Sequence, residues 1–81
     1  METRVAVIAI LVKDRGSAQK LNEILHEYAD YIIGRMGLPY PSKQVSIVSV
    51  AVDAPQPIIA ALSGKIGALP SISVKTAYAD A

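Results

Sequence analysis

The sequence contains no cysteine, no tryptophan and no phenylalanine among its 81 residues, and it has one histidine. Without cysteine, neither a disulfide nor a thiolate metal site can form within the chain. A single histidine also leaves a zinc or nickel site of the usual nitrogen and sulfur type short of ligands. A domain of this size then has one common stabilising device left, which is association with copies of itself.

An excess of charge of either sign is also missing. Eight lysines and arginines stand against seven aspartates and glutamates, and the basic residues are scattered along the chain. This balance predicts no basic surface that could bind a polyanion, so we expect no direct contact with nucleic acid. The apolar run at residues 5–12 is too short for a membrane span, and charged residues 13–15 follow it where a signal peptide would have a cleavage site. We therefore expect a cytoplasmic protein without membrane contact.

One unbroken apolar run, three further strand-like segments and two helical stripes predict the element order βαββαβ. Strands are expected at residues 5–12, 31–33, 44–52 and 72–78, and the prolines of segment 38–41 predict irregular structure there. Ser17 and Asp53 are expected to cap the two helices, and Gly67 is expected to end the second helix in the left-handed conformation. The apolar stripes of the two helices are Leu21, Ile24, Leu25 and Tyr28, and Ile58, Ile59, Leu62 and Ile66.

This element order predicts one α+β domain over residues 1–81 with a ferredoxin-like fold. Right-handed crossovers place both helices on one face of a four-stranded antiparallel sheet with the strand order 4-1-3-2. The odd-numbered and even-numbered side chains of residues 5–12 point to opposite faces, and both rows are apolar. Because a soluble monomer rarely leaves such a face bare, we expect a dimer or tetramer that forms through the sheet.

Residues with catalytic chemistry are few and isolated. No serine lies in a G-x-S-x-G motif, and His26 alone would have to serve any triad, so we predict that the chain is not an enzyme and needs no cofactor. His26 precedes Asp30 by four residues, but no third metal ligand is near, which favours a solvated or interfacial histidine over a metal site. Residues 64–67 match the GXXG clamp of some nucleic-acid-binding modules, although a helix C-cap explains these glycines better.

The loop formed by Asp14, Arg15, Gly16 and Ser17 is the best candidate for a binding site. A glycine lets a ligand approach the backbone, and the free amides at a helix start favour a carboxylate or phosphate. An ordinary tight turn closed by Asp14 and Gly16 explains the same residues. If a site is present, we expect it to take a small anionic or amino-acid-like ligand.

Two resemblances extend this interpretation. Residues 14–16 and the helix that follows resemble the start of an ACT domain. Nearly the whole chain is similar to the iron-only hydrogenase system regulator family, which is itself similar to the effector-binding C-terminal domain of the nickel-responsive repressor. The segments that carry this resemblance are Leu25-His26-Glu27-Tyr28, Gly34-Arg35-Met36-Gly37-Leu38-Pro39-Tyr40, Leu62-Ser63-Gly64-Lys65-Ile66-Gly67 and Val74-Lys75.

The resemblance implies an ACT-like fold and a transcriptional or metabolic regulator of an iron-only hydrogenase system. Such a regulator would sense a small ligand as an oligomer and would have no DNA-binding module of its own. A protein-interaction or assembly module for hydrogenase maturation is the alternative. The nickel-responsive repressor uses several histidines and a cysteine as ligands, whereas this chain offers only His26, so nickel sensing is not expected.

Overall fold

Four strands and two helices follow one another in the predicted order in the computed structural model, which describes residues 2–79. The strand order is β2-β3-β1-β4, which is the predicted 4-1-3-2 seen from the other edge, and every pairing is antiparallel. The predicted ferredoxin-like fold is therefore confirmed. The elements are β1 (Arg4–Val12), α1 (Arg15–Glu27), the 3-10 turn η1 (Ala29–Tyr31), β2 (Ile32–Tyr40), the 3-10 turn η2 (Pro41–Lys43), β3 (Val45–Ala54), α2 (Gln56–Gly67) and β4 (Ile72–Tyr78).

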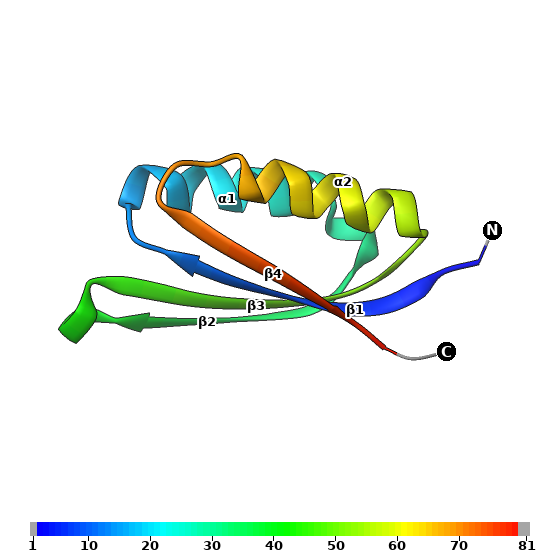
Figure 1. Cartoon of the computed structure of the whole chain (residues 1–81), viewed down its shortest axis with the longest axis horizontal. Helices are drawn as coiled ribbons and strands as arrows, with labels where there is room; N and C mark the ends of the chain where they lie inside the picture. The colour runs from blue at the N-terminus through cyan, green and yellow to red at the C-terminus, as the bar shows by residue number, and fades with distance from the viewer. Residues whose placement is uncertain (1, 80–81) are drawn as a thin grey trace.

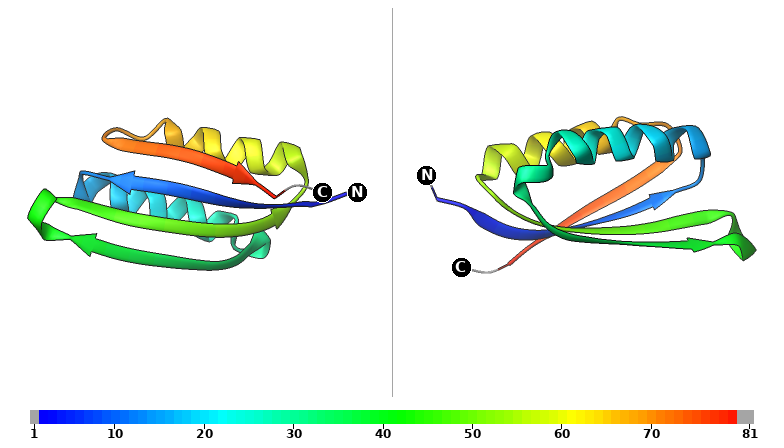
Figure 2. Two further views of the ribbon diagram at one scale, coloured as in Figure 1. Left: turned by 60° about the horizontal axis from the view of Figure 1, so that its bottom comes forward. Right: turned by 180° about the vertical axis from the view of Figure 1, so that it is seen from behind.

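The molecule has two layers, and both helices lie on the same side of the sheet (Figure 1). Burial alternates along the central strands, because even-numbered side chains of β1 and β3 point toward the helices and odd-numbered ones point away. Figure 2 shows that the opposite side of the sheet carries no helix. The core between the layers consists of Ala6, Ile8, Ile10, Val12, Leu21, Leu25, Val48, Val50, Val52, Ala54, Ile59, Leu62 and Ile66.

The prediction for the second strand is wrong in length. β2 continues to Tyr40 and pairs with β3 along its whole length, where irregular structure was expected at 38–41. A β-bulge between Ile32 and Gly34 absorbs the irregularity at its start. Pro39 is tolerated because β2 lies at the edge of the sheet, where a missing N–H need not break a ladder hydrogen bond.

The predicted helix caps are also wrong. α1 begins at Arg15, with Asp14 at the N-cap position, so Ser17 lies inside the first turn. β3 runs through Asp53 to Ala54, and Pro55 takes the N-cap position of α2. Gly67 is the last residue of α2 and has no positive φ, so it is not a left-handed cap. Ala68, in the right-handed helical conformation, is the C-cap.

Close packing between α2 and β4 explains the glycine at position 67 better than a left-handed cap does. A Cβ atom at this position would lie 3.1 Å from Cγ1 of Val74. The residue that does take the left-handed conformation is Ser71, with a φ of 59°, directly before β4. Gly67 is therefore needed for helix–strand contact, while the change of direction occurs four residues later.

Candidate functional site

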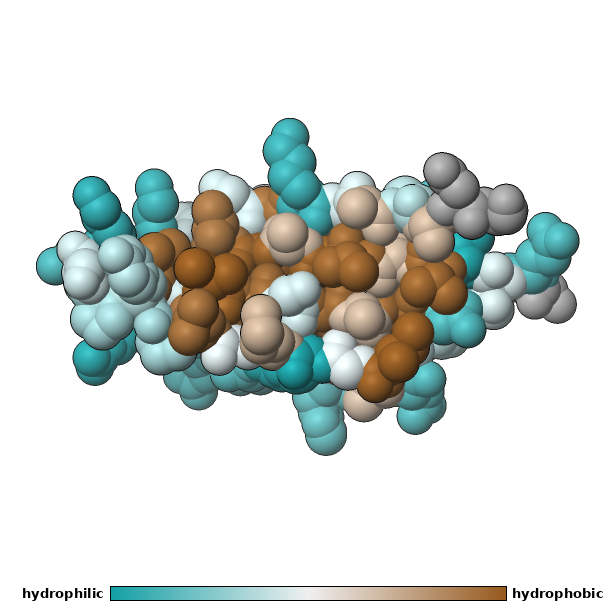
Figure 3. Space-filling view, turned by 90° about the horizontal axis from the view of Figure 1, so that it is seen from below, coloured by the Kyte–Doolittle hydropathy of each residue, from teal (hydrophilic) through white to brown (hydrophobic). Residues whose placement is uncertain are grey.

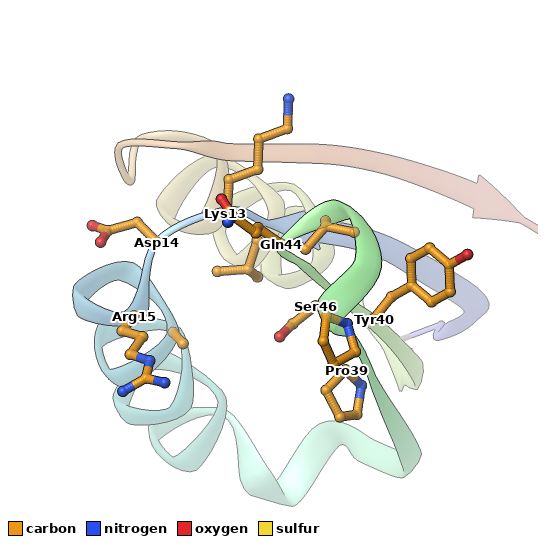
Figure 4. Close-up of a pocket in the computed structure, with 11 residues that line it drawn as sticks. Lys13, Asp14, Arg15, Pro39, Tyr40, Gln44 and Ser46 are labelled. Carbon is orange, nitrogen blue, oxygen red and sulfur yellow. The ribbon is translucent and has the colours of Figure 1, made fainter.

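A cleft of about 480 Å³ lies where the loop between β1 and α1 meets the end of the β2–β3 hairpin. Figure 4 shows the two walls, with α1 and the preceding loop on one side and the hairpin on the other. The pairings of Val12 with Ser46 and of Tyr40 with Val45 bring the hairpin end beside the end of β1. The cleft is lined by Val12, Lys13, Asp14, Arg15, Ala18, Pro39, Tyr40, Pro41, Gln44, Val45 and Ser46.

Backbone hydrogen bonds fix the loop wall of the cleft. The Lys13 amide donates to the Ser71 carbonyl at 3.0 Å, and the Ala18 amide donates to the Asp14 carbonyl at 3.0 Å as the first bond of α1. The amides of residues 15–17 precede that bond and have no partner within the helix. The Asp14 side chain makes no capping hydrogen bond, and the first turn holds no acidic residue. The start of α1 therefore keeps its partial positive charge beside the cleft.

The structure brings only part of the predicted loop site together. Asp14 and Arg15 line the cleft, and Gly16 is exposed next to Asp14 without lining it. Ser17 is 1% exposed, and its hydroxyl donates to the Pro70 carbonyl, so its side chain belongs to the core. The predicted ligand-binding residues thus reduce to two cleft residues and one neighbouring glycine.

The hairpin wall was missed from the sequence. Gln44 and Ser46 contribute an amide and a hydroxyl, and Figure 4 shows the Ser46 hydroxyl directed from β3 toward α1. Gln44 takes the left-handed conformation, with a φ of 53°, as the turn closes. The alternation of Met36, Leu38 and Tyr40 with small or polar residues was the available signal for a strand that reaches this end of the sheet.

The polar groups of the cleft suit a small charged ligand better than they suit a reaction. Arg15, Lys13 and the free amides of α1 can hold a carboxylate or phosphate, and the Ser46 hydroxyl can add a hydrogen bond. The Asp14 carboxylate can in turn accept from an ammonium group. No group of three or more metal-ligating side chains occurs within residues 2–79.

A second hollow, of about 320 Å³, lies at the other end of α1 and contains His26. α1 ends at Glu27 and Asp30 lies in η1, so His26 and Asp30 do not share a continuous helix as the predicted pair would require. Asn22 and Arg35 meet across this hollow, with an Arg35 Nη2 to Asn22 Oδ1 distance of 2.8 Å. His26 therefore shares this hollow with an arginine and an amide.

The outer side of the helix layer carries the one ion pair within residues 2–79. Lys65 of α2 approaches Glu27 of α1, with an Nζ to Oε2 distance of 3.2 Å. Its ammonium group also lies 5.1 Å from the centre of the Tyr28 ring. Two hydrogen bonds, the stronger influence from Tyr28 and the next from Glu27, raise the pKa of Lys65 above its ordinary value. This cluster joins the two helices at the surface and faces neither hollow.

The sheet side opposite the helices exposes a continuous apolar surface, here called the open face. It consists of the odd-numbered rows of β1, β3 and β4 together with Met36, Leu38 and Tyr40 of β2. Val7 and Leu11, on the central strand, are each 43% exposed. Figure 3 shows apolar residues running along this face, with polar residues gathered at its margins. Tyr40 and Val45 belong to both the open face and the cleft.

None of the helices in residues 2–79 has the length and apolar character needed to cross a membrane.

The two-layer fold with its open sheet face defines an ACT-like α+β domain. Residues 4–76 match the model of the TM1266-like family, described as "Iron-only hydrogenase system regulator, putative", and the chain belongs to this family. The resemblance inferred from the sequence is therefore confirmed. The family is one of regulators, and no enzyme activity is part of its description. No curated protein matches the chain significantly.

Solved structures show the same fold, and one of them agrees with the family assignment. The protein TM1266 from Thermotoga maritima is similar with a TM-score of 0.94 and 29% identity, over 98% of this chain and 100% of that one. The C-terminal domain of the MgtC protein from Mycobacterium tuberculosis has a TM-score of 0.76 and 6% identity, over 94% and 87%. A formyltetrahydrofolate deformylase from Pseudomonas putida KT2440 has a TM-score of 0.65 and 12% identity, over 94% and 29%. The last two show the fold alone.

Proposed function

We propose that this chain is a self-associating, ligand-sensing regulator of an iron-only hydrogenase system. The observation that carries the proposal is the continuity between the cleft and the open face, which share Tyr40 and Val45. A second copy that covers the open face would press on these two residues. A ligand in the cleft would contact the same residues, so binding and association would be thermodynamically linked.

The occupant we propose for the open face is a second copy of this chain. Two sheets pack face to face at a separation of about 10 Å, and alternating small and large side chains fill the space between them. Ala9, Ser49 and Ala51 stand among valine, leucine and isoleucine side chains on the central strands of the open face. A dimer or tetramer through the sheet would remove this surface from water.

The ligand we propose for the cleft is a small anion or an amino acid. An anionic group would lie against Arg15 and the free amides of α1, and an ammonium group would lie against Asp14. Lys plus Arg exceeds Asp plus Glu by one, so we propose that the chain acts through small molecules and proteins rather than by holding DNA directly. The cytoplasm is the compartment we propose, because a regulator meets its targets there.

Thermal unfolding followed by circular dichroism tests the sensing role. Amino acids, nucleotides, inorganic phosphate and metal salts would be added one at a time to the protein. A compound at 100 times its Kd adds about 2.7 kcal/mol of stability. For a domain of this size, that raises the Tm by roughly 10–20 °C.

Arg15→Ala should abolish such a shift, and Lys20→Ala is the matched control because Lys20 is an exposed cation of α1 outside the cleft. A panel in which no compound raises the Tm contradicts ligand sensing. A shift that survives Arg15→Ala contradicts the assignment to the cleft.

A further inference from the structure

The hollow at the C-terminal half of α1 is built from three elements. Asn22, Leu25 and His26 lie on one face of the helix because they are three or four residues apart. η1 adds Ala29, and β2 adds Ile32 and Arg35. None of these residues lines the cleft at the other end of α1, so the two hollows are separate.

The polar side of this hollow consists of hydrogen-bond donors. Arg35 donates one N–H to the Asn22 carbonyl oxygen, which leaves four guanidinium N–H groups and both N–H groups of the Asn22 amide outside this bond. A neutral imidazole also keeps one N–H, so His26 can donate in either protonation state. No carboxylate lines the hollow, and Arg35 forms no ion pair within residues 2–79. These groups lack an anionic acceptor.

The other side of the hollow is apolar. Leu25 is 1% exposed and belongs to the core, Ile32 is half-buried, and Ala29 adds a methyl group. Small-molecule sites in proteins have this composition, with apolar walls and a few placed polar groups in about 300 Å³ or more. The hollow, at about 320 Å³, lies at the small end of that range.

We propose that this hollow binds a small organic carboxylate with a short hydrocarbon part. The carboxylate lies against the free edge of the Arg35 guanidinium, with donors from Asn22 and His26, and the hydrocarbon part lies on Leu25, Ala29 and Ile32. The Asn22–Arg35 hydrogen bond holds the guanidinium in place before the ligand arrives, which lowers the entropic cost of binding. This site is independent of the cleft and of the function proposed for it.

Titration of the ¹⁵N-labelled protein with sodium butyrate, followed by amide chemical shifts, tests the site. We expect saturable shifts at residues 22–35, and these residues alone report on this hollow because the cleft can also hold an anion. Butyramide has the same hydrocarbon part without the charge, and inorganic phosphate has charge without the hydrocarbon part. At residues 22–35, both should bind at least tenfold more weakly than butyrate.

Variants at Arg35 provide the second test. Arg35→Ala should weaken butyrate binding at least tenfold, and Arg35→Lys should weaken it less but measurably, because an ammonium lacks the two-pronged geometry of a guanidinium. Lys20→Ala removes another cation of α1, and Arg15→Ala removes one from the cleft, and both should bind butyrate as the parent does. The absence of saturable shifts, equal binding of phosphate, or unchanged binding by Arg35→Ala would each overturn the proposal.

Discussion

At the scale of single residues, Ser17 shows how one hydroxyl joins two distant parts of the chain. It lies in the first turn of α1, it is 1% exposed, and it donates to the carbonyl of Pro70 in the loop before β4. The Lys13 amide donates to Ser71 in the same loop. These two bonds tie the start of α1, and with it one wall of the cleft, to the segment that enters β4.

Ser17→Ala is predicted to destabilise the fold by about 1–2 kcal/mol, because the Pro70 carbonyl loses its donor in a part-buried place. Urea unfolding measures this difference. Ser42→Ala is the matched control, since Ser42 lies exposed in η2. Equal unfolding midpoints for the two variants would contradict a structural role for the Ser17 hydrogen bond.

Glu27 and Lys65 illustrate a surface interaction that changes a pKa with little effect on stability. Both side chains are largely exposed, so solvent screens their attraction. Glu27→Gln is predicted to lower the pKa of Lys65 toward its ordinary value and to leave the urea midpoint at neutral pH unchanged.

The Lys65 pKa can be followed by NMR titration of its side chain. Because its pKa is raised in the folded state, any stabilisation from this group is present below its unfolded pKa and is lost as the pH rises above that value. A clear fall of the midpoint at neutral pH in Glu27→Gln, beyond that of Glu23→Gln, would contradict this interpretation.

At the scale of elements, the two glycines of α2 have different roles. Both lie in helical conformation, where glycine costs about 1 kcal/mol relative to alanine. A Cβ atom at Gly64 would meet nothing within 4 Å, whereas one at Gly67 would press on Val74. Only at the second glycine does packing leave little space for a methyl group.

Gly64→Ala is therefore predicted to stabilise the protein by about 0.5–1 kcal/mol, through the lower conformational entropy of the unfolded chain. Gly67→Ala should gain less or lose stability, because its methyl group displaces Val74 from the face of α2. Urea unfolding of the two variants side by side provides the comparison. A larger gain at Gly67 than at Gly64 would show that β4 adjusts freely, against this prediction.

Sequence patterns predicted β1, β3 and β4 well because β1 is an unbroken apolar run and β3 and β4 are rich in β-branched residues. The strand order followed from the handedness of the crossovers. The same patterns failed to predict the length of β2, because its glycines and proline are typical of loops. Tertiary pairing overrides that local preference, since β3 offers a complete edge along which β2 can pair.

The candidate site was predicted in the same uneven way. Asp14 and Arg15 could be found because they lie in one loop, which with Val12, Lys13 and Ala18 supplies one wall of the cleft. The opposite wall exists only because β2 is long enough for its hairpin to reach the end of β1. Because the length of β2 was underestimated, Gln44 and Ser46 were not predicted as site residues. Contacts between segments some 30 residues apart depend on register, which local patterns do not fix.

At the scale of the whole molecule, the two faces of the sheet differ in their exposure to water. On the helix side of the two central strands, the side chains from Ala6 to Val12 and from Val48 to Ala54 are buried. On the open face, the exposed fractions of Val5, Val7, Leu11, Met36, Leu38 and Tyr40 range from 43% to 59%. Apolar surface in water costs about 25 cal/mol per Å², so removing it under a second sheet would contribute favourably to association. The charged members of the open face, Asp53 and Lys75, lie away from its centre on β3 and on the edge strand β4.

Val7→Lys is predicted to turn the proposed assembly into a folded monomer. Val7 lies on the central strand β1 and points out of the open face, so the monomer can hold the lysine in water. In the assembly, the ammonium would be buried without a partner, at a cost of roughly 3 kcal/mol or more. The dissociation constant should then rise by about a hundredfold or more, since each 1.4 kcal/mol is a factor of ten.

Sedimentation velocity at micromolar concentration measures this change, and circular dichroism checks that the variant is folded. Ala61→Lys is the matched control, because it adds the same charge to an exposed position of α2 on the opposite layer. Association should survive that substitution and be lost in Val7→Lys. A parent protein that sediments as a monomer at these concentrations would refute the assembly itself. Association that persists in Val7→Lys would place the contact elsewhere, with β2 and β4 left as the unpaired edges through which two sheets could join.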